Sequence, residues 1–468
     1  MSQEVKENEM GTKSVGRLLL AYSLPAILGM IIISVNHIIS SIFIGYGVDP
    51  LALSAMAVTF PVGNIFMAFC QLIAVGCAAW CSIELGRKDM KAANSMLGHS
   101  VKLELMFSVV FGIIFWYLLD PMLIFFGASE DTLPFAHDFM VPLILTSPMG
   151  FLMLGLNFMA RSTGYAKTAM MTNILSALGT VIFSPIFIYW LEWGMLGASL
   201  AQVMGQIMST IWLVAHFARK TTIVHFQPGI WTLDMSNVRR ILALGMAPFL
   251  MNFCACAVVV ILNRSLLAYG GDMAVGAYGI VNRLLMLFAM SVVGLGQGMQ
   301  PIIGYNFGAK RPDRVRLTLK YGMAAGTTVT ALGMAAFLFI PEPMVRMFTD
   351  HEPLIAVSTH AMFLCGCMFI FVGPGIMAGT YFQAIGQAKI AAIMSLMRQC
   401  ICLIPALLLL PRVFGLDGIW YSIPAADLAG FVVAAYFLYV TIKAEDNNCQ
   451  PGDPECTPPS DFFKPKDM

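Results

Sequence analysis

The second half of this 468-residue sequence resembles the first half at an offset of about 222 residues. A duplicated unit of this length implies two structurally similar halves. Such repeats are typical of membrane transporters, in which the two copies face each other across a central cleft. The matching positions include Gly164 with Gly386, Lys167 with Lys389, Tyr46 with Tyr269, Pro25 with Pro248 and Pro185 with Pro405.

The composition requires a lipid environment. Hydrophobic residues make up 58% of the chain and charged residues 11%, with a mean hydropathy of +0.78. A soluble domain carries about 25% charged residues, so this chain has more apolar surface than a soluble core can bury. The net charge of +1 gives no indication of nucleic-acid binding. We therefore expect an integral membrane protein whose surroundings are the lipid bilayer.

Twelve apolar segments are long enough to cross a bilayer, which takes about 20 residues of helix. We expect an all-α membrane protein with twelve transmembrane helices, arranged as two parallel six-helix repeats around a central cleft. The six segments of the first half lie near residues 18–44, 51–82, 95–118, 134–159, 166–191 and 195–218. Those of the second half lie near residues 240–267, 274–305, 315–340, 355–382, 389–410 and 417–442.

The distribution of lysine and arginine predicts the orientation. If both termini are cytoplasmic, 21 basic residues face the cytoplasm, while only Arg264, Arg346 and Arg412 face outward. Basic residues concentrate on the cytoplasmic side, so we expect a multi-pass protein of a bacterial inner membrane with both termini inside. The expected divisions are a cytoplasmic segment at 1–17, a bundle at 18–218, a cytoplasmic linker at 219–239, a second bundle at 240–443 and a disordered tail at 444–468.

The eleven cysteines lie mostly within the apolar segments. They have neither the spacing nor the companion histidines of a zinc site, so we expect them to be small buried hydrophobic residues. Nothing in their pattern indicates an oxidising compartment. We expect no bound metal and no cofactor.

Residues 294–310 read GLGQGMQPIIGYNFGAK, and a proline-containing first span precedes Phe60, Pro61 and Asn64. With these motifs the chain resembles the multidrug and toxic compound extrusion (MATE) family over nearly its whole length. The resemblance implies two six-helix bundles around a central cleft and export of bulky organic cations in exchange for protons or sodium ions. Residues typical of the bacterial multidrug members stand at Arg398, Gln399, Pro405, Pro411, Gly415, Leu416, Asp417, Gly418 and Asp427.

The chain departs from that family at the cation site of the first half. Family members usually carry aspartates where this chain has Ser40 and Ser184, an asparagine at Thr180 and a threonine at Gln202. Another frequent acid is replaced by Thr163. A hydroxyl group can solvate a cation but does not titrate at physiological pH. We therefore expect ion coupling either to act elsewhere in the protein or to be absent.

Ionisable groups inside a membrane are costly and are candidates for function. Asp427 is our first candidate for ion coupling, with Arg398 on the adjacent span as its partner and Arg283 as a second possible partner. A purely structural ion pair is the alternative. His37, one helical turn before Ser40, is the second candidate for the titrating group, and a hydrogen-bonded structural histidine is its alternative.

Lys102 and Glu104 are ionisable residues of the third predicted span, but we do not expect them to take part in ion coupling. Lys102 and Glu104 lie near its start, so we expect their long side chains to reach water at the cytoplasmic interface.

Polar residues within the spans are candidates for the substrate and cation pathway, although interhelical hydrogen bonds explain them equally well. These candidates are Asn36, Ser40, Asn64, Thr180, Ser184, Gln202, Gln297, Gln300 and Asn306.

We interpret the chain as a secondary active antiporter that acts as a monomer. It is expected to export amphipathic or cationic small organic molecules by alternating access, coupled to protons. A sodium-coupled exporter and a flippase for lipid-linked precursors are the alternatives, although a flippase would need an arginine-lined cleft. The sequence contains neither HExxH nor GxSxG, so no enzymatic activity is expected.

Overall fold

The computed structural model describes residues 9–48, 50–227, 229 and 232–448. Every regular element among these residues is a helix. Residues 1–8 of the predicted cytoplasmic segment, three positions of the linker and residues 449–468 of the predicted tail lie outside the described residues. The last helix runs to Asn448, past the predicted end of the last span at residue 443.

The helices of the first half follow the apolar segments. Asp89 caps one of them by accepting a hydrogen bond from the Ala92 amide at 2.9 Å. Their bounds are α1 Glu9–Thr12, α2 Val15–Gly47, α3 Pro50–Gly86, α4 Met90–Phe125, α5 Leu133–Leu145, α6 Ser147–Ser162, α7 Ala166–Pro185, the π-helical turn η1 Ile186–Trp190 and α8 Gly194–Phe217. A bend of 61° separates α5 from α6, so that together they form one broken span.

The second half repeats this pattern with two further interruptions. A bend of 48° lies between α12 and the α13 region, and a π-helical turn, η3, precedes Pro405. The bounds are α9 Met235–Gly308, α10 Pro312–Phe339, α11 Pro341–Arg346, α12 Glu352–Gly366, the 3-10 turn η2 Phe369–Phe371, α13 Val372–Ala384, α14 Ala388–Leu396, η3 Met397–Leu403, α15 Ile404–Phe414 and α16 Leu416–Asn448.

The 74-residue helix α9 is a hairpin of two spans. Its backbone leaves the helical conformation at Gly271, where φ is 63°. A positive φ is accessible to glycine because it has no Cβ atom. The two ends of α9 return to the same helix, since Ile241 lies against Gly76 and Tyr305 lies against Gly86 of α3.

The number of spans agrees with the prediction. Among the described residues, nine helices are long and apolar enough to cross a membrane, or eleven if each bent pair forms one span. Counting the two arms of α9 separately raises eleven to twelve. The prediction of an all-helical, multi-pass membrane protein is therefore confirmed.

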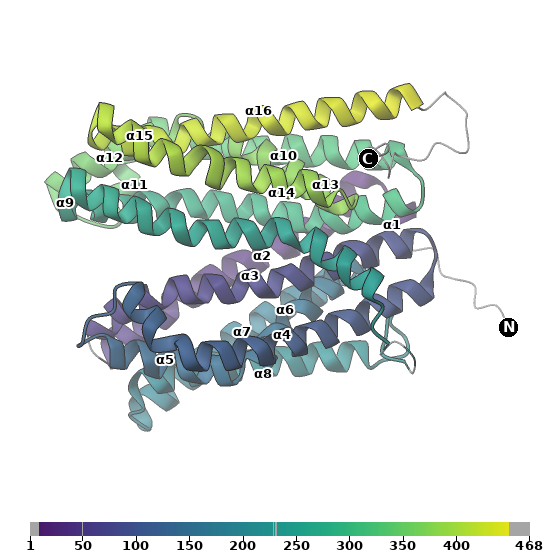
Figure 1. The fold of residues 1–468 in the computed structure, drawn as a ribbon, viewed down its shortest axis with the longest axis horizontal. Coiled ribbons are helices and arrows are strands. Elements are labelled where there is room, and N and C mark those ends of the chain that lie inside the picture. Colours follow the sequence, from purple (N-terminus) through teal and green to yellow (C-terminus); the bar gives the residue numbers. More distant parts are fainter. Residues whose placement is uncertain (1–8, 49, 228, 230–231, 449–468) are drawn as a thin grey trace, which may run out of the picture.

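The two halves of the chain form two bundles that lie side by side (Figure 1). Helices α2 to α8 make up one bundle, and α9 to α16 make up the other. We call the end of the molecule that carries Arg87, Arg240 and Arg311 the basic end. The side chain of Arg240 lies 5.6 Å from the Trp80 ring there, and Arg311 contacts the backbone of α1.

Among the described residues, the buried cluster that the two bundles share contains the side chains of the basic end. There one cluster of buried side chains contains Ile73 and Leu97 of the first bundle together with Ile241 and Ile302 of the second. At the opposite end each bundle has a core of its own. The core of the first includes Phe111, Phe115 and Phe151, and the core of the second includes Phe337, Phe369 and Trp420. The molecule is therefore closed between its bundles at the basic end.

Glycines allow the backbones of the two bundles to approach closely at this end. We call the contact of residues 72–86 of α3 with residues 241–245 and 297–308 of α9 the seam. A Cβ atom on Gly245 would collide with the Leu72 carbonyl, and one on Gly308 would collide with the Ile83 carbonyl. Small residues permit such close helix packing in membranes, where burial of apolar surface does not drive helices together.

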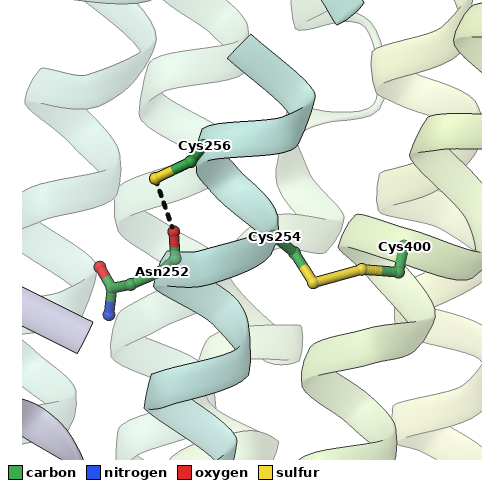
Figure 2. Close-up of a disulfide and its surroundings, with 4 residues drawn as sticks. All are labelled: Asn252, Cys254, Cys256 and Cys400. Atoms are coloured by element: carbon green, nitrogen blue, oxygen red, sulfur yellow. Dashed lines mark hydrogen bonds between the residues drawn. A yellow bond between two sulfur atoms is a disulfide. The ribbon is translucent and has the colours of Figure 1, made fainter. Parts of the chain in front are cut away.

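One cysteine pair differs from the prediction. Cys254 of α9 and Cys400 of η3 form a disulfide, with their Cα atoms 6.3 Å apart (Figure 2). The neighbouring Cys256 thiol instead donates to the Asn252 carbonyl at 3.5 Å. The expectation that the cysteines act only as small hydrophobic residues is therefore wrong for this pair, because α9 and η3 bring together positions that are 146 residues apart.

We expect Gly245→Ala to destabilise the protein by about 1–3 kcal/mol, because the added methyl group would push α9 away from α3. Thermal unfolding of the purified protein in detergent would measure the change. Gly279→Ala is the matched control on the same helix, because a Cβ atom at Gly279 meets nothing within 4 Å. Equal effects of the two substitutions would contradict the tight seam.

Candidate ion and substrate sites

Four of the predicted pathway residues form a polar cluster of two hydrogen-bonded pairs inside the first bundle, and Ser184 lies one helical turn after one of them. They are supplied by α2, α7 and α8. The Asn36 amide donates to the Thr180 hydroxyl at 3.5 Å, and the Gln202 amide donates to the Ser40 hydroxyl at 3.2 Å. Ser40, Thr180 and Ser184 are buried. The cluster offers neutral oxygens and amides, which can solvate a cation or bind a polar group of a substrate but carry no charge.

His37 lies beside this cluster on α2 and is exposed. Its backbone carbonyl accepts a hydrogen bond from Ser41 at 2.9 Å. Within the described part of the chain, no hydrogen bond or ion pair involves its imidazole ring. The interhelical hydrogen bond considered as an alternative role is thus not seen, and its role in coupling stays a prediction.

Asp427 of α16 and Arg398 of η3 are paired as expected from their adjacent spans. The Nε atom of Arg398 donates to Oδ1 of Asp427 at 2.7 Å. Asp427 is 3% exposed, whereas the Arg398 side chain is 40% exposed. The carboxylate is therefore buried and its partner reaches the surface of the bundle. The arginine belongs to a π-helical turn, a local distortion that is frequent at functional sites.

Arg283 does not act as a second partner of Asp427. It is exposed on the second arm of α9, and no ion pair joins it to an acidic residue in the part of the chain that the structure describes. Of the two possible partners, Arg398 is therefore the one that pairs with the carboxylate in this conformation.

Gln297 and Gln300 line a small cavity at the seam. The cavity measures ≈ 10 Å³ and lies between α3, α6 and the second arm of α9. Arg161, at the end of α6, projects to the same place. The other lining residues are Ala78, Ser82, Phe158, Ser162 and Pro301.

Asn306 and Asn64 belong neither to the polar cluster of the first bundle nor to the lining of the cavity. The Asn306 amide donates to the carbonyls of Ile302 and Met10 at 2.8 and 3.2 Å, and its oxygen accepts from Arg314 Nε at 2.9 Å. These bonds attach α1 to the second bundle, so Asn306 is engaged structurally. The Asn64 side chain lies beside the Cys256 thiol between the bundles.

Glu104 of α4 is a buried acid whose environment the sequence did not reveal. It is 0% exposed, and neither carboxyl oxygen has a hydrogen-bond partner in the described region. The carboxyl group lies against Gly155 of α6, where a Cβ atom would be only 2.6 Å from Oε1. The expected position at a watery interface is wrong. Because an unpaired buried carboxylate is very costly, we expect this side chain to be the neutral acid.

The described residues contain no group of three or more histidine, cysteine, aspartate or glutamate side chains that could hold a metal ion. The candidate sites are therefore a neutral cluster in the first bundle, a buried ion pair in the second and a donor-rich cavity between them. Such an arrangement can bind, orient and exchange protons, and it provides no constellation for covalent catalysis.

A protein-family model matches both halves of the chain. The model described as MatE matches residues 25–186 and 244–408, one match in each bundle. The chain therefore belongs to the MATE family of membrane transporters, as its sequence motifs indicated.

Individual relatives extend over almost the whole chain. The multidrug export protein MepA of Staphylococcus haemolyticus (strain JCSC1435) is 26% identical over 427 residues, which cover 91% of this chain and 94% of that protein. The MATE multidrug transporter DinF-BH, solved as a ligand complex, is 32% identical, with a TM-score of 0.87, covering 94% of this chain and 98% of that one. A MATE structure in the bent conformation shares the fold, with 19% identity and a TM-score of 0.88 over 94% of this chain and 98% of that one.

We expect Glu104→Gln to change the free energy of unfolding by less than about 1 kcal/mol, because a neutral amide replaces a neutral acid of the same shape. Glu104→Lys should cost more than about 3 kcal/mol, because it places a charge where no partner is available. Thermal unfolding of both purified variants would measure the difference. If the glutamine variant were as unstable as the lysine variant, the neutral state of Glu104 would be excluded.

Proposed function

We propose that this protein exports amphipathic or cationic small molecules across a bacterial inner membrane by alternating access, in exchange for protons. The observation that carries the proposal is the shared core at the basic end combined with separate cores at the opposite end. Two bundles that share a core at one end can exchange this closure for closure at the other end. Basic residues mark the cytoplasmic side, so this conformation is closed toward the cytoplasm.

The nature of the substrate is inferred from relatives and from the side chains. Curated relatives are described as multidrug export proteins, and the similar transporter DinF-BH is described as a multidrug transporter. The chain contains 35 methionines and 33 phenylalanines, whose deformable and polarisable side chains suit a permissive apolar pocket. The neutral cluster around Ser40 and Gln202 supplies hydrogen-bonding atoms within the first bundle.

Asp427 is the coupling residue in this proposal. A proton taken up from the outer side binds its carboxylate and weakens the 2.7 Å contact with Arg398. The same proton is released to the cytoplasm in the alternate conformation, where the ion pair forms again. The partly exposed arginine can leave the carboxylate without being buried alone, which makes this exchange physically accessible. Glu104 is a second acid whose proton could be exchanged if the α4–α6 contact opens.

We expect Asp427→Asn to reduce proton-driven export by roughly tenfold or more, because the amide can neither take up nor release a proton. The measurement is transport by purified protein in vesicles under an imposed proton gradient. Asp417→Asn is the matched control, because Asp417 lies on the same helix, is partly exposed and pairs with His360 at 3.0 Å.

Unchanged proton-driven export in Asp427→Asn would leave the Arg398 pair with a structural role only. Transport that follows a sodium gradient instead would favour sodium coupling. Movement of a lipid-linked precursor without export of organic cations would favour the flippase alternative.

A further inference from the structure

Arg161 is a buried charge without a counter-ion. The residue is 6% exposed, and its Nη1 atom is buried without a hydrogen-bond partner. Among the described residues, its guanidinium carbon lies 5.5 Å from the centre of the Phe158 ring. No acidic residue in the described ranges forms an ion pair with it.

This arrangement is not stable for an isolated arginine. Glu104 can remain neutral in its apolar site, but a guanidinium group stays protonated in proteins. A cation–π contact with phenylalanine offsets only part of the cost of removing the charge from water. A further partner for Arg161 is therefore required, and an anion satisfies the charge as well as the hydrogen bonds.

The cavity at the seam has the size and the donors for such a partner. A cavity of ≈ 10 Å³ has room for about one water-sized particle, which excludes a bulky organic substrate. The buried Nη1 of Arg161 and Nε2 of Gln300 are both without partners and belong to residues that line it. Gln297 also lines it with a buried Oε1 atom that has no hydrogen-bond partner, and its amide can rotate to present nitrogen instead.

The charge of the ligand follows from these groups. The hydroxyls of Ser82 and Ser162 already donate to backbone carbonyls, at 2.9 Å in each case. The unused donors come from an arginine and an amide, so a cation would be repelled whereas a small anion would be held by charge-assisted hydrogen bonds. A single water molecule would fill the space but would leave the positive charge uncompensated.

We propose that this cavity binds one small monovalent anion, such as chloride, which neutralises Arg161 and connects it to Gln300. Arg161 belongs to the first bundle and Gln300 to the second, so the bound anion links the bundles across the seam. The anion thereby stabilises closure at the basic end. This inference rests on the cavity and does not depend on the substrate or on the coupling ion.

Thermal unfolding of the purified full-length protein in choline chloride and in choline gluconate, at equal ionic strength, tests the proposal. The unfolding midpoint should rise by several degrees with chloride and reach a plateau, because a ligand that binds only the folded state stabilises it. Bromide should replace chloride, whereas the much larger gluconate should not. Equal midpoints in chloride and gluconate would overturn the proposal and leave water as the occupant.

Substitutions of the lining residues test whether the chloride dependence of unfolding arises at this cavity. Arg161→Gln should lose the chloride dependence while remaining at least as stable as the wild type in gluconate, because it removes the unpaired charge. Arg161→Lys should keep a weaker dependence, and Gln300→Leu should raise the chloride concentration at half-maximal effect roughly tenfold.

Arg239→Gln is the control, because Arg239 is an exposed arginine near the start of α9 and lies outside the cavity. It should retain the wild-type response. A full chloride response in Arg161→Gln would exclude this site. Loss of transport in vesicles with an intact chloride response would contradict the proposed function and leave the anion site standing.

Discussion

Direct contact between backbones at the seam is the constraint on which the rest of the structure depends. Residues without a side chain, such as Gly245 and Gly308, allow α9 to lie against the carbonyls of α3. In a bilayer, apolar surface gains little from leaving lipid, so close packing and hydrogen bonds must hold the bundles together. The Ser23 hydroxyl adds such a bond to the Leu295 carbonyl at 3.3 Å. The separate cores at the opposite end follow because no comparable contact joins them among the described residues.

Much of the architecture was predictable from the chain because membrane constraints act directly on sequence. Apolar runs long enough to cross lipid and the alternation of basic residues predicted the spans, and the duplicated prolines predicted the repeat. The hairpin within α9 was also expected, as two spans that meet near residue 270. Its sharp reversal depends on Gly271, which belongs to the one Gly-Gly pair of the sequence and is followed by Asp272, a combination typical of a turn.

The sites were only partly predictable. The pairing of Arg398 with Asp427 followed from their positions on adjacent spans, and the cluster around Ser40 followed from the family motif. The buried and unpaired states of Glu104 and Arg161 were not predicted, because they depend on which faces of α4 and α6 meet other helices. The disulfide of Cys254 and Cys400 was not predicted either, because periodicity does not indicate which residues of distant spans come within bonding distance.

The short helix α1 precedes the first bundle in the chain, but its hydrogen bonds join it to the second bundle. The carbonyls of Gly11 and Lys13 accept bonds from Arg311 and Arg314 at 2.7 and 2.6 Å. Only a few residues separate these bonds from the start of α2 at Val15. If the bundles part at the basic end, α1 must either detach from these arginines or draw the first turn of α2 along with it. The amino-terminal segment is thus a short mechanical tether, and its length limits how far that end can open while the tether holds.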